Sequence, residues 1–215
     1  MNAGSGTDRT AGGDPTIQPL DAAGWQLAAR VLAAGMLDNP LHVRVFGTDE
    51  RRREQRLRRF MACAADHVGR EGTLLGAYRG HELVGVLGVA PPGCCRPVPP
   101  RSWRYAAAIA AGNPPAATWR VARWLAAWAR HDPPGPHWHL GPLAVLPAWR
   151  RRGVGGALLR RACADLDGAM TWLETDLERN VGFYRAFGFV LAHEEEVLGV
   201  RTWFMRRLPG AGPGR

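Results

Sequence analysis

Residues 146–161, LPAWRRRGVGGALLRR, place three arginines and three glycines between an apolar strand-like run and an apolar helix-like run. The first four backbone N–H groups of a helix have no partner inside it, and the helix dipole adds about half a positive charge there. Gly153, Gly155 and Gly156 carry no Cβ, so a ligand is able to approach the amides of residues such as Val154 closely. The stretch therefore predicts a cradle for a diphosphate.

Arg150, Arg151 and Arg152 precede this turn and add full positive charges beside it. The stretch contains neither G-x-x-x-x-G-K-[ST] nor G-x-G-x-x-G, which excludes a P-loop and a dinucleotide fingerprint. Taken alone, the turn is equally compatible with a tight strand-to-helix connection that binds nothing. The remainder of the C-terminal half decides between these two interpretations.

The elements that would position this turn follow from hydrophobic periodicity and from turn residues. Strand patterns and helix patterns alternate in the C-terminal half, with hairpins near both ends, which predicts an α/β or α+β fold with a mixed sheet. The expected strands are 16–20, 73–79, 83–90, 137–146, 170–176, 189–198 and 201–208, and the expected helices are 21–37, one capped by Thr48 or Asp49, 119–130, 153–167 and 181–187.

Two groups of residues on the expected helices have a structural interpretation that we favour over a role in ligand binding. The arginines of the second helix fit a solvated face, and Val121, Trp124, Leu125 and Trp128 form a stripe that is typical of a core. A substrate platform is the alternative for the stripe. The arginines in question are Arg51, Arg52, Arg53, Arg56, Arg58 and Arg59.

The composition bounds the class of protein. With 215 residues, 46% hydrophobic and 22% charged, the chain suits a single domain over 15–208 between flexible tails at 1–14 and 209–215. No apolar run reaches the length of a membrane span, and the N-terminal residues lack the apolar core of a signal peptide. The four cysteines show no C-x-x-C spacing, so we expect reduced thiols, no metal site and a cytoplasmic location.

The net charge of +9 raises the question of nucleic-acid binding. The arginines are scattered over several amphipathic segments, and no nucleic-acid-binding motif is present. We therefore expect no nucleic-acid partner, and an anionic small molecule explains the local cluster.

Two motifs in the C-terminal half resemble those of the GCN5-related N-acetyltransferases. Arg150-x-x-Gly153-x-Gly155 after LAVLP is similar to the family's acetyl-CoA-binding motif, and ERNVGFYRAFGF (178–189) is similar to its second signature. Within the family the chain is most similar to the puromycin N-acetyltransferase-like members. The detailed resemblance covers 137–207, and the N-terminal half agrees in element order.

The resemblance implies a mostly antiparallel, mixed, seven-stranded sheet that splays open between its fourth and fifth strands, flanked by about four or five helices. The sequence supports the splay, because Gly141 and Pro142 should bulge the strand at 137–146. Backbone groups at Leu143, Ala144 and Val145 would then be free to pair with the pantetheine arm of acetyl-CoA, the expected cofactor.

The resemblance also implies how acetyl transfer would proceed. In the family, the tyrosine that matches Tyr184 protonates the departing CoA sulfur, although packing against the sheet is its structural alternative. Asn180 would cap the short helix or hydrogen-bond the pantetheine. A backbone N–H near Val145 would stabilise the oxyanion.

Two residues compete for the role of the general base. His139 lies eleven residues before Arg150, where the histone-acetylating branch of the family carries a catalytic glutamate, and its ordinary pKa near 6.5 would suit the task. Glu174 on the strand at 170–176 is the rival, and simple packing is the alternative for both. Glu174, Asp176 and Glu178 also form an acidic stretch that would attract a cationic amine.

We therefore expect an acetyl-CoA-dependent enzyme that acetylates a primary amine of a small molecule, by direct transfer in a ternary complex. An antibiotic or another amine metabolite would serve as acceptor, and the enzyme would act as a monomer or homodimer. The alternatives are acetylation of a protein lysine or N-terminus, and a module that senses acyl-CoA or binds nucleic acid without catalysis.

Overall fold

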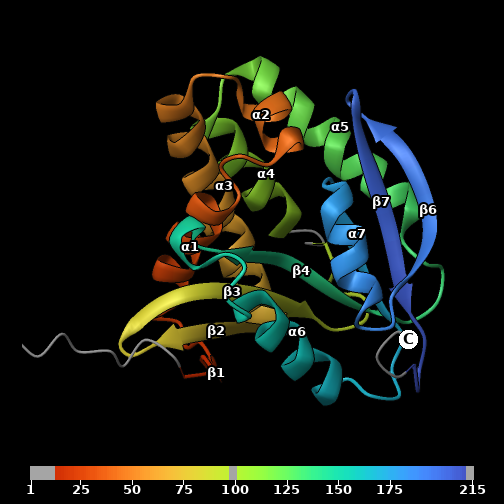
Figure 1. Cartoon of the computed structure of the whole chain (residues 1–215). Helices are drawn as coiled ribbons and strands as arrows, with labels where there is room; N and C mark the ends of the chain where they lie inside the picture. Colours follow the sequence, from red (N-terminus) through yellow and green to blue (C-terminus); the bar gives the residue numbers. More distant parts are fainter. Residues whose placement is uncertain (1–12, 97–100, 212–215) are drawn as a thin grey trace, which may run out of the picture.

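A computed structural model describes residues 13–96 and 101–211 and contains one seven-stranded sheet in the order β1-β2-β3-β4-β5-β7-β6 (Figure 1). The strands are β1 (Thr16–Pro19), β2 (Thr73–Arg79), β3 (Glu82–Ala90), β4 (Trp138–Val145), β5 (Thr171–Thr175), β6 (Val190–Val197) and β7 (Val200–Arg207). The helices are α1 (Trp25–Gly35), α2 (Pro40–Phe46), α3 (Glu50–Glu71), α4 (Arg101–Gly112), α5 (Pro115–His131), α6 (Val154–Asp165) and α7 (Glu178–Arg185), with a short 3₁₀ turn at Pro147–Trp149.

The sheet divides between β4 and β5, as expected. Neighbouring strands pair antiparallel everywhere except at β4 and β5, which are parallel and pair only at Trp138 with Thr171 and His139 with Trp172. Beyond His139 the two strands separate. Hereafter this opening between β4 and β5 is called the splay.

The bulge expected at Gly141 and Pro142 is present in β4. The register against β3 passes from Leu143 opposite Leu87 to Leu140 opposite Val89, so two residues of β4 face Gly88 alone. A Cβ on Gly88 would lie 2.3 Å from the Gly141 carbonyl oxygen. Glycine at this position therefore permits the close approach of the two strands.

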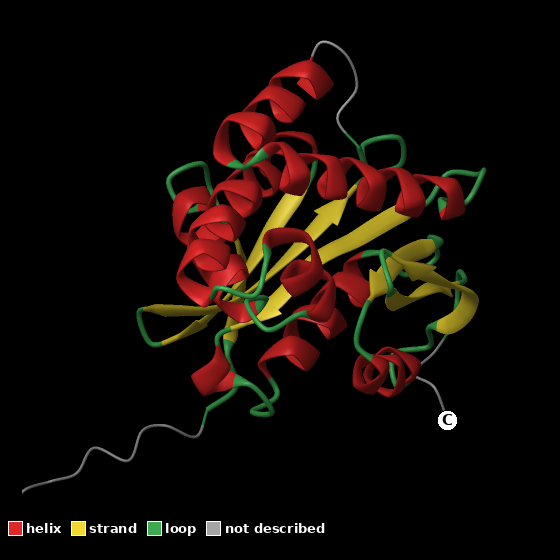
Figure 2. Ribbon diagram, turned by 90° about the horizontal axis from the view of Figure 1, so that it is seen from above, coloured by secondary structure: helices red, strands yellow, loops and turns green. Residues whose placement is uncertain are grey.

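Helices cover both faces of the sheet. The helices α1 to α5 lie over one face, and α6 lies under the other (Figures 1 and 2). The buried side chains form two clusters accordingly, one beneath α1, α2, α3 and α5 and one around α6 and α7. The splay opens between these two layers, so a ligand that enters it reaches both.

Two helices were not expected from the sequence, and they bring the described helices to seven rather than four or five. Asn39 and Pro40 follow the helix expected at 21–37, and the Asn39 side chain accepts hydrogen bonds from the N–H groups of Leu41 and His42 and starts α2. Asn-Pro serves equally well as a helix start, with proline in the first turn. The other unexpected helix, α4, follows a proline-rich stretch of which residues 97–100 lie outside the described residues.

The prediction that the α3 arginines form a solvated face is wrong for Arg53. Its side chain is only 7% exposed and donates hydrogen bonds of 2.9 Å to the carbonyls of Leu37, Gly47 and Thr48. A guanidinium has five donors and can satisfy several helix-end carbonyls at once. Arg53 therefore ties together the ends of α1 and α2.

Further expectations from the sequence concern helix capping, the core, the cysteines, membrane spans and the tails. Asp49 caps α3 by accepting from the Arg52 N–H. In the α5 stripe, Val121 and Trp124 are buried in the core as expected, but all four stripe residues also line the cavity described below. The four cysteines are free. None of the described helices is long and apolar enough to cross a membrane. Most of the two predicted flexible tails lies outside the described residues.

Candidate active site

The stretch predicted to be a cradle lies where β4 leads into α6. Gly153 is the N-cap of α6 and adopts a φ of 79°, a left-handed conformation that glycine tolerates best. No side chain caps the helix. Within the described part of the chain, no protein group accepts a hydrogen bond from the N–H groups of residues 151–156. These amides are therefore free to bind an anion.

The two glycines in the first turn of α6 are not required by the packing of the protein itself. A Cβ on Gly155 would lie 3.7 Å from Phe183 and Val145, and one on Gly156 would lie at least 3.5 Å from its nearest neighbour, Arg160. Both are ordinary van der Waals distances. The missing side chains leave room on the outer side of the helix start, as a cradle requires.

The arginines around the cradle divide into two groups. Arg150 lines the cavity but is engaged by the protein itself, in a bidentate pair with Asp38, at 2.6 and 2.8 Å, and a hydrogen bond to the Gly35 carbonyl, so it anchors the turn to the end of α1. Arg152 lies over the Trp149 ring. Arg151 lines the cavity described below, together with Arg160 and Arg179, which the sequence analysis did not single out. Arg160 lies one turn after Gly156 on the same helix face, and this spacing could have identified it.

The edge of β4 that faces the splay has backbone groups without ladder partners. The Leu146 N–H donates to the Val84 carbonyl, and Val145 lies opposite Gly85. Because antiparallel residues alternate in the direction of their backbone groups, those of Leu143 and Val145 point away from β3 toward the splay. Those of Ala144 point toward β3, so two of the three predicted residues offer amides to a bound chain.

The residues of the second signature lie on α7, beside the splay. Tyr184 is buried and lines the cavity, and among the described residues its hydroxyl has no hydrogen-bond partner. Burial, and to a lesser extent Asp176 and Glu174, raise its pKa above the ordinary value for tyrosine. Asn180 does not cap the helix; its amide donates to the Thr175 hydroxyl and ties α7 to β5. Tyr184 is thus held as a protonated phenol facing the cavity.

The two rival bases, His139 and Glu174, are bonded to each other. His139 Nε2 lies 2.9 Å from Glu174 Oε2, and their side chains are only 14% and 1% exposed. Glu174 Oε1 also accepts from the Trp172 indole N–H. Burial is the largest single influence and lowers the pKa of His139, but Glu174 and Cys95 together outweigh it and raise this pKa to about 10. The expectation of a pKa near 6.5 for His139 is therefore wrong, because an isolated strand pattern does not reveal the ion pair.

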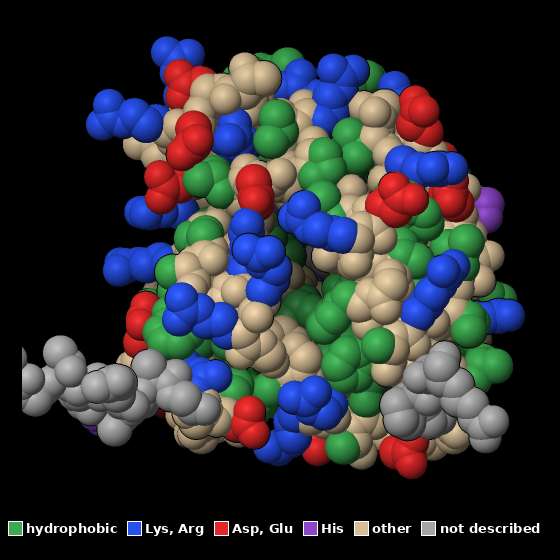
Figure 3. All heavy atoms as spheres, in the orientation of Figure 1, with side chains coloured by type: hydrophobic (Ala, Val, Ile, Leu, Met, Phe, Trp, Pro, Cys, Tyr) green, Lys and Arg blue, Asp and Glu red, His purple; other side chains and the backbone are tan. Residues whose placement is uncertain are grey.

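A cavity of about 1510 Å³ connects these parts. It extends from the amides at the start of α6, through the splay, to a chamber between α3, α4 and α5. Figure 3 shows the outer part as a hollow with hydrophobic side chains at its floor and arginines around it. We call the inner part the aromatic chamber, and its walls include Phe60, Met61, Tyr105, Ile109, Trp124 and Trp128.

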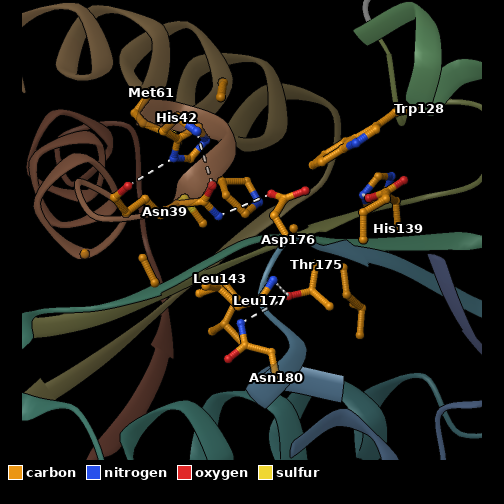
Figure 4. A pocket seen from close by; sticks show the side chains of 18 of the residues that line it. Asn39, His42, Met61, Trp128, His139, Leu143, Thr175, Asp176, Leu177 and Asn180 are labelled. Atoms are coloured by element: carbon orange, nitrogen blue, oxygen red, sulfur yellow. Dashed lines mark hydrogen bonds and ion pairs between the residues drawn. The ribbon is translucent and has the colours of Figure 1, made fainter. Parts of the chain in front are cut away.

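The acidic stretch at the end of β5 supplies the cavity with carboxylates. Glu174 lies in β5 and Asp176 directly follows the strand, and both residues line the cavity. Figure 4 shows Asp176 between Asn39 on one side and His139 and Trp128 on the other. Glu178, the third residue of the stretch, is exposed on α7.

Comparison with known proteins gives the same family as the motifs. The model of the Acetyltransferase (GNAT) family matches residues 40–189. The chain belongs to the GNAT acetyltransferase family. It is an N-acetyltransferase, and acetyl-CoA is its cofactor.

Solved structures of other GNAT proteins share the fold. One is described as histone acetyltransferase HPA2 and related acetyltransferase from Corynebacterium glutamicum, with 23% identity over 92% of this chain and 98% of its own, and a TM-score of 0.68. A polyamine N-acetyltransferase from Drosophila melanogaster has 18% identity over 90% and 99%, with a TM-score of 0.59. The ribosomal-protein-S18-alanine N-acetyltransferase of Escherichia coli has 15% identity over 92% and 96%, with a TM-score of 0.54.

The residues of this GNAT chain fit acetyl-CoA. The unpaired amides at 151–156 suit its diphosphate, and the free edge at Leu143 and Val145 suits the amides of its pantetheine arm. Arg151 and Arg160 supply positive charge where the diphosphate would lie.

A separate cluster of ionisable side chains lies outside this cavity. Ligand atoms of His131, His193 and Glu195 lie within 4.8 Å of one another, but Glu195 already pairs with Arg130 and His131. Neighbouring Glu194 pairs with Arg201 on the same hairpin. We assign the cluster to the packing of α5 against β6.

Proposed function

We propose that this enzyme transfers the acetyl group of acetyl-CoA directly to a primary amine of a small molecule, with both bound at once. The observation that carries the proposal is the cavity, which is continuous from the cradle at α6 to the aromatic chamber. The chamber is lined by residues of α3, α4 and α5 and leaves space for a compact molecule. A lysine in the middle of a peptide would require a groove open at both ends.

Bound acetyl-CoA supplies a thioester whose carbonyl accepts the amine and whose sulfur departs as a thiolate. The amides at the start of α6, with Arg151 and Arg160, would hold the diphosphate. The edge of β4 at Leu143 and Val145 would hold the pantetheine arm, and the Val145 N–H is directed toward the splay, where it could stabilise the oxyanion. This arrangement would bring the thioester to the aromatic chamber.

Tyr184 then acts as the proton donor to the departing sulfur. The support is its position on α7 beside the splay, its unpartnered hydroxyl and the raised pKa that keeps it protonated. His139 and Glu174 are poor bases as they stand, since His139 holds its proton and Glu174 is almost fully enclosed. We assign this pair the task of holding β4 and β5 together at the point where they begin to separate.

Acetylation of a protein lysine or N-terminus is the second candidate. The acceptor distinguishes this candidate from the first, because a folded protein cannot place a segment from the middle of its backbone into a chamber lined by α4 and α5. A cytoplasmic location and action on an antibiotic amine stay predictions, as does the absence of a nucleic-acid partner.

The test is release of free thiol from acetyl-CoA in the presence of small amines, including puromycin and aminoglycosides, and of lysine-containing and N-terminal peptides. The chain contains no lysine, so acetylation of its own lysine side chains does not contribute to the signal. We expect turnover with at least one small amine and none with the peptides. Turnover with peptides alone would replace the proposal by the second candidate.

A further inference from the structure

Asp176 is a buried carboxylate whose partners are neutral. It is 7% exposed; its Oδ1 accepts from the Thr202 hydroxyl at 2.7 Å, and its Oδ2 accepts from the Asn39 amide at 3.2 Å. Over residues 13–96 and 101–211, no arginine or histidine forms an ion pair with it. The other two carboxylates lining the cavity, Glu174 and Asp38, are each paired with a cationic residue.

A carboxylate buried without a counter-ion is costly when charged, because water is excluded and no cation compensates. Asp176 borders the cavity, so a cation that enters the chamber is able to supply this compensation. It also lies directly after β5, two residues beyond Glu174, beside the splay where the thioester is expected (Figure 4). An acceptor ammonium at Asp176 would therefore lie close to the acetyl group.

The walls above Asp176 are apolar and largely aromatic. Phe60 and Trp124 have ring centroids 5.2 Å apart, and Trp124 and Trp128 meet edge to face at 5.1 Å. Met61 and Ile109 complete the apolar lining. Such walls favour a flat or branched hydrocarbon group and disfavour a chain that carries several charges.

We propose that Asp176 binds the ammonium group of the acceptor and takes its first proton, and that the aromatic chamber binds an apolar, aromatic body attached to that single amine. The inference rests on the proposed function. It extends that function by naming the proton acceptor and a class of substrate, the primary amines on an aromatic or alkyl group with one positive charge.

The protons of the reaction balance on this assignment. Asp176 takes one proton from the ammonium and releases it to solvent after turnover. The free amine attacks the thioester carbonyl, a C–N bond forms and the C–S bond breaks. Tyr184 gives its proton to the thiolate, and the proton that the nitrogen loses on becoming an amide restores the phenol. The net products are the amide, the free thiol and one proton.

The titration of Asp176 suits this task. Burial raises its pKa to about 6, although the hydrogen bonds from Thr202 and Asn39 oppose the rise and Glu174 adds to it. The titratable groups nearby are Glu174 on β5, paired with His139 on β4, Tyr184 on α7, and His42 on α2, whose pKa burial lowers to about 4. Compared with His139, Tyr184 and His42, Asp176 is the group whose pKa lies between 5 and 8.

The first experiment replaces the carboxylate. In Asp176→Asn the new amide would face the Asn39 amide, which cannot turn because its oxygen already accepts from Leu41 and His42. The double variant Asn39→Asp/Asp176→Asn restores this hydrogen bond and the net charge but moves the carboxylate to α2. We expect both variants to lose at least about 100-fold in kcat/KM for the amine, with the KM for acetyl-CoA changed less than about threefold.

The second experiment uses pH. We expect kcat/KM for the amine to fall below about pH 6 in the wild type. Thr202→Val removes a hydrogen bond that lowers the pKa of Asp176. The acidic limb of the profile of kcat/KM against pH should therefore move to higher pH, while the maximum value of kcat/KM changes little. A limb unmoved by Thr202→Val, or full activity in the double variant, overturns the role of Asp176.

The third experiment tests the substrate class with 2-phenylethylamine, 1,4-diaminobutane and spermidine. We expect 2-phenylethylamine to have a kcat/KM at least about tenfold above those of the two polycations, the size expected from burying one apolar group. A preference for the polycations overturns the class. Absence of turnover with every small amine overturns the proposed function itself, and turnover with an unaffected Asp176→Asn variant overturns the inference alone.

Discussion

His139 and Glu174 form one ion pair across the last residues that join β4 to β5, with 2.9 Å between Nε2 and Oε2. Removing one partner of a buried pair leaves the other without compensation. We expect Glu174→Gln to lower the free energy of unfolding by roughly 3–5 kcal/mol near pH 6. The exposed neighbour Glu178→Gln is the control and should change it by less than about 0.5 kcal/mol.

The loss in Glu174→Gln should depend on pH. The pKa of His139 is about 10 in the folded protein, above its ordinary value of 6.5, so the pair stabilises fully below pH 6.5 and this stabilisation disappears as the pH rises through 10. Urea unfolding of both proteins at pH 6, 8 and 10 measures the difference. A difference that stays constant over this range would show that His139 does not carry its proton in the folded state.

The same pair predicts how a histidine variant behaves in catalysis. Because His139 stays protonated between pH 5 and 8, it cannot produce an acidic limb in that range. We expect the limb near pH 6 to persist in His139→Ala, at reduced overall activity, when kcat/KM is measured against pH. Loss of the limb in this variant, but not in Asp176→Asn, would make His139 the base.

Gly155 tests the cradle. The packing of the protein accommodates a methyl group at Gly155, so Gly155→Ala should fold normally and bind acetyl-CoA more weakly. Gly155→Glu places a negative charge where the diphosphate is expected. We predict that saturating acetyl-CoA raises the melting temperature of the wild type but not of Gly155→Glu. An undiminished shift in Gly155→Glu would place the cofactor elsewhere.

Tyr184→Phe separates catalysis from packing. The hydroxyl has no partner among the described residues, so its removal should leave the melting temperature nearly unchanged. We expect kcat to fall about 100-fold, with the KM for acetyl-CoA altered far less. Steady-state kinetics with a thiol reagent give both constants, and an unchanged kcat would reduce Tyr184 to a packing residue.

A variant of Arg53 tests the conclusion that this α3 arginine is a buried structural residue and not part of the solvated face. Its side chain satisfies three carbonyls at the junction of α1, α2 and α3, whereas Arg51 is exposed. Arg53→Met should lower the free energy of unfolding by roughly 3 kcal/mol, since buried carbonyls lose charged donors, and Arg51→Met by less than about 0.5 kcal/mol. Chemical denaturation measures the free energy of unfolding of the two variants. Equal losses would show that Arg53 contributes no more than a residue of the solvated face.

The sequence by itself determined the local elements that carry the cofactor. A helix start without a capping side chain, the glycines at 153, 155 and 156, and the bulge at Gly141 and Pro142 are properties of adjacent residues. Backbone conformation and helix amides depend on near neighbours, so a short stretch of sequence contains the information. The same holds for the hairpins.

The tertiary structure alone decided which charges meet. His139 and Glu174 are 35 positions apart in the sequence, Arg150 finds Asp38 at a separation of 112 positions, and Asp176 finds Asn39 at 137. Protonation depends on burial and on charges within a few ångströms, and no periodicity in the chain records these distances. Hence the sequence could name His139 and Glu174 as rivals, whereas the fold makes them partners and leaves Asp176 as the carboxylate without a cation.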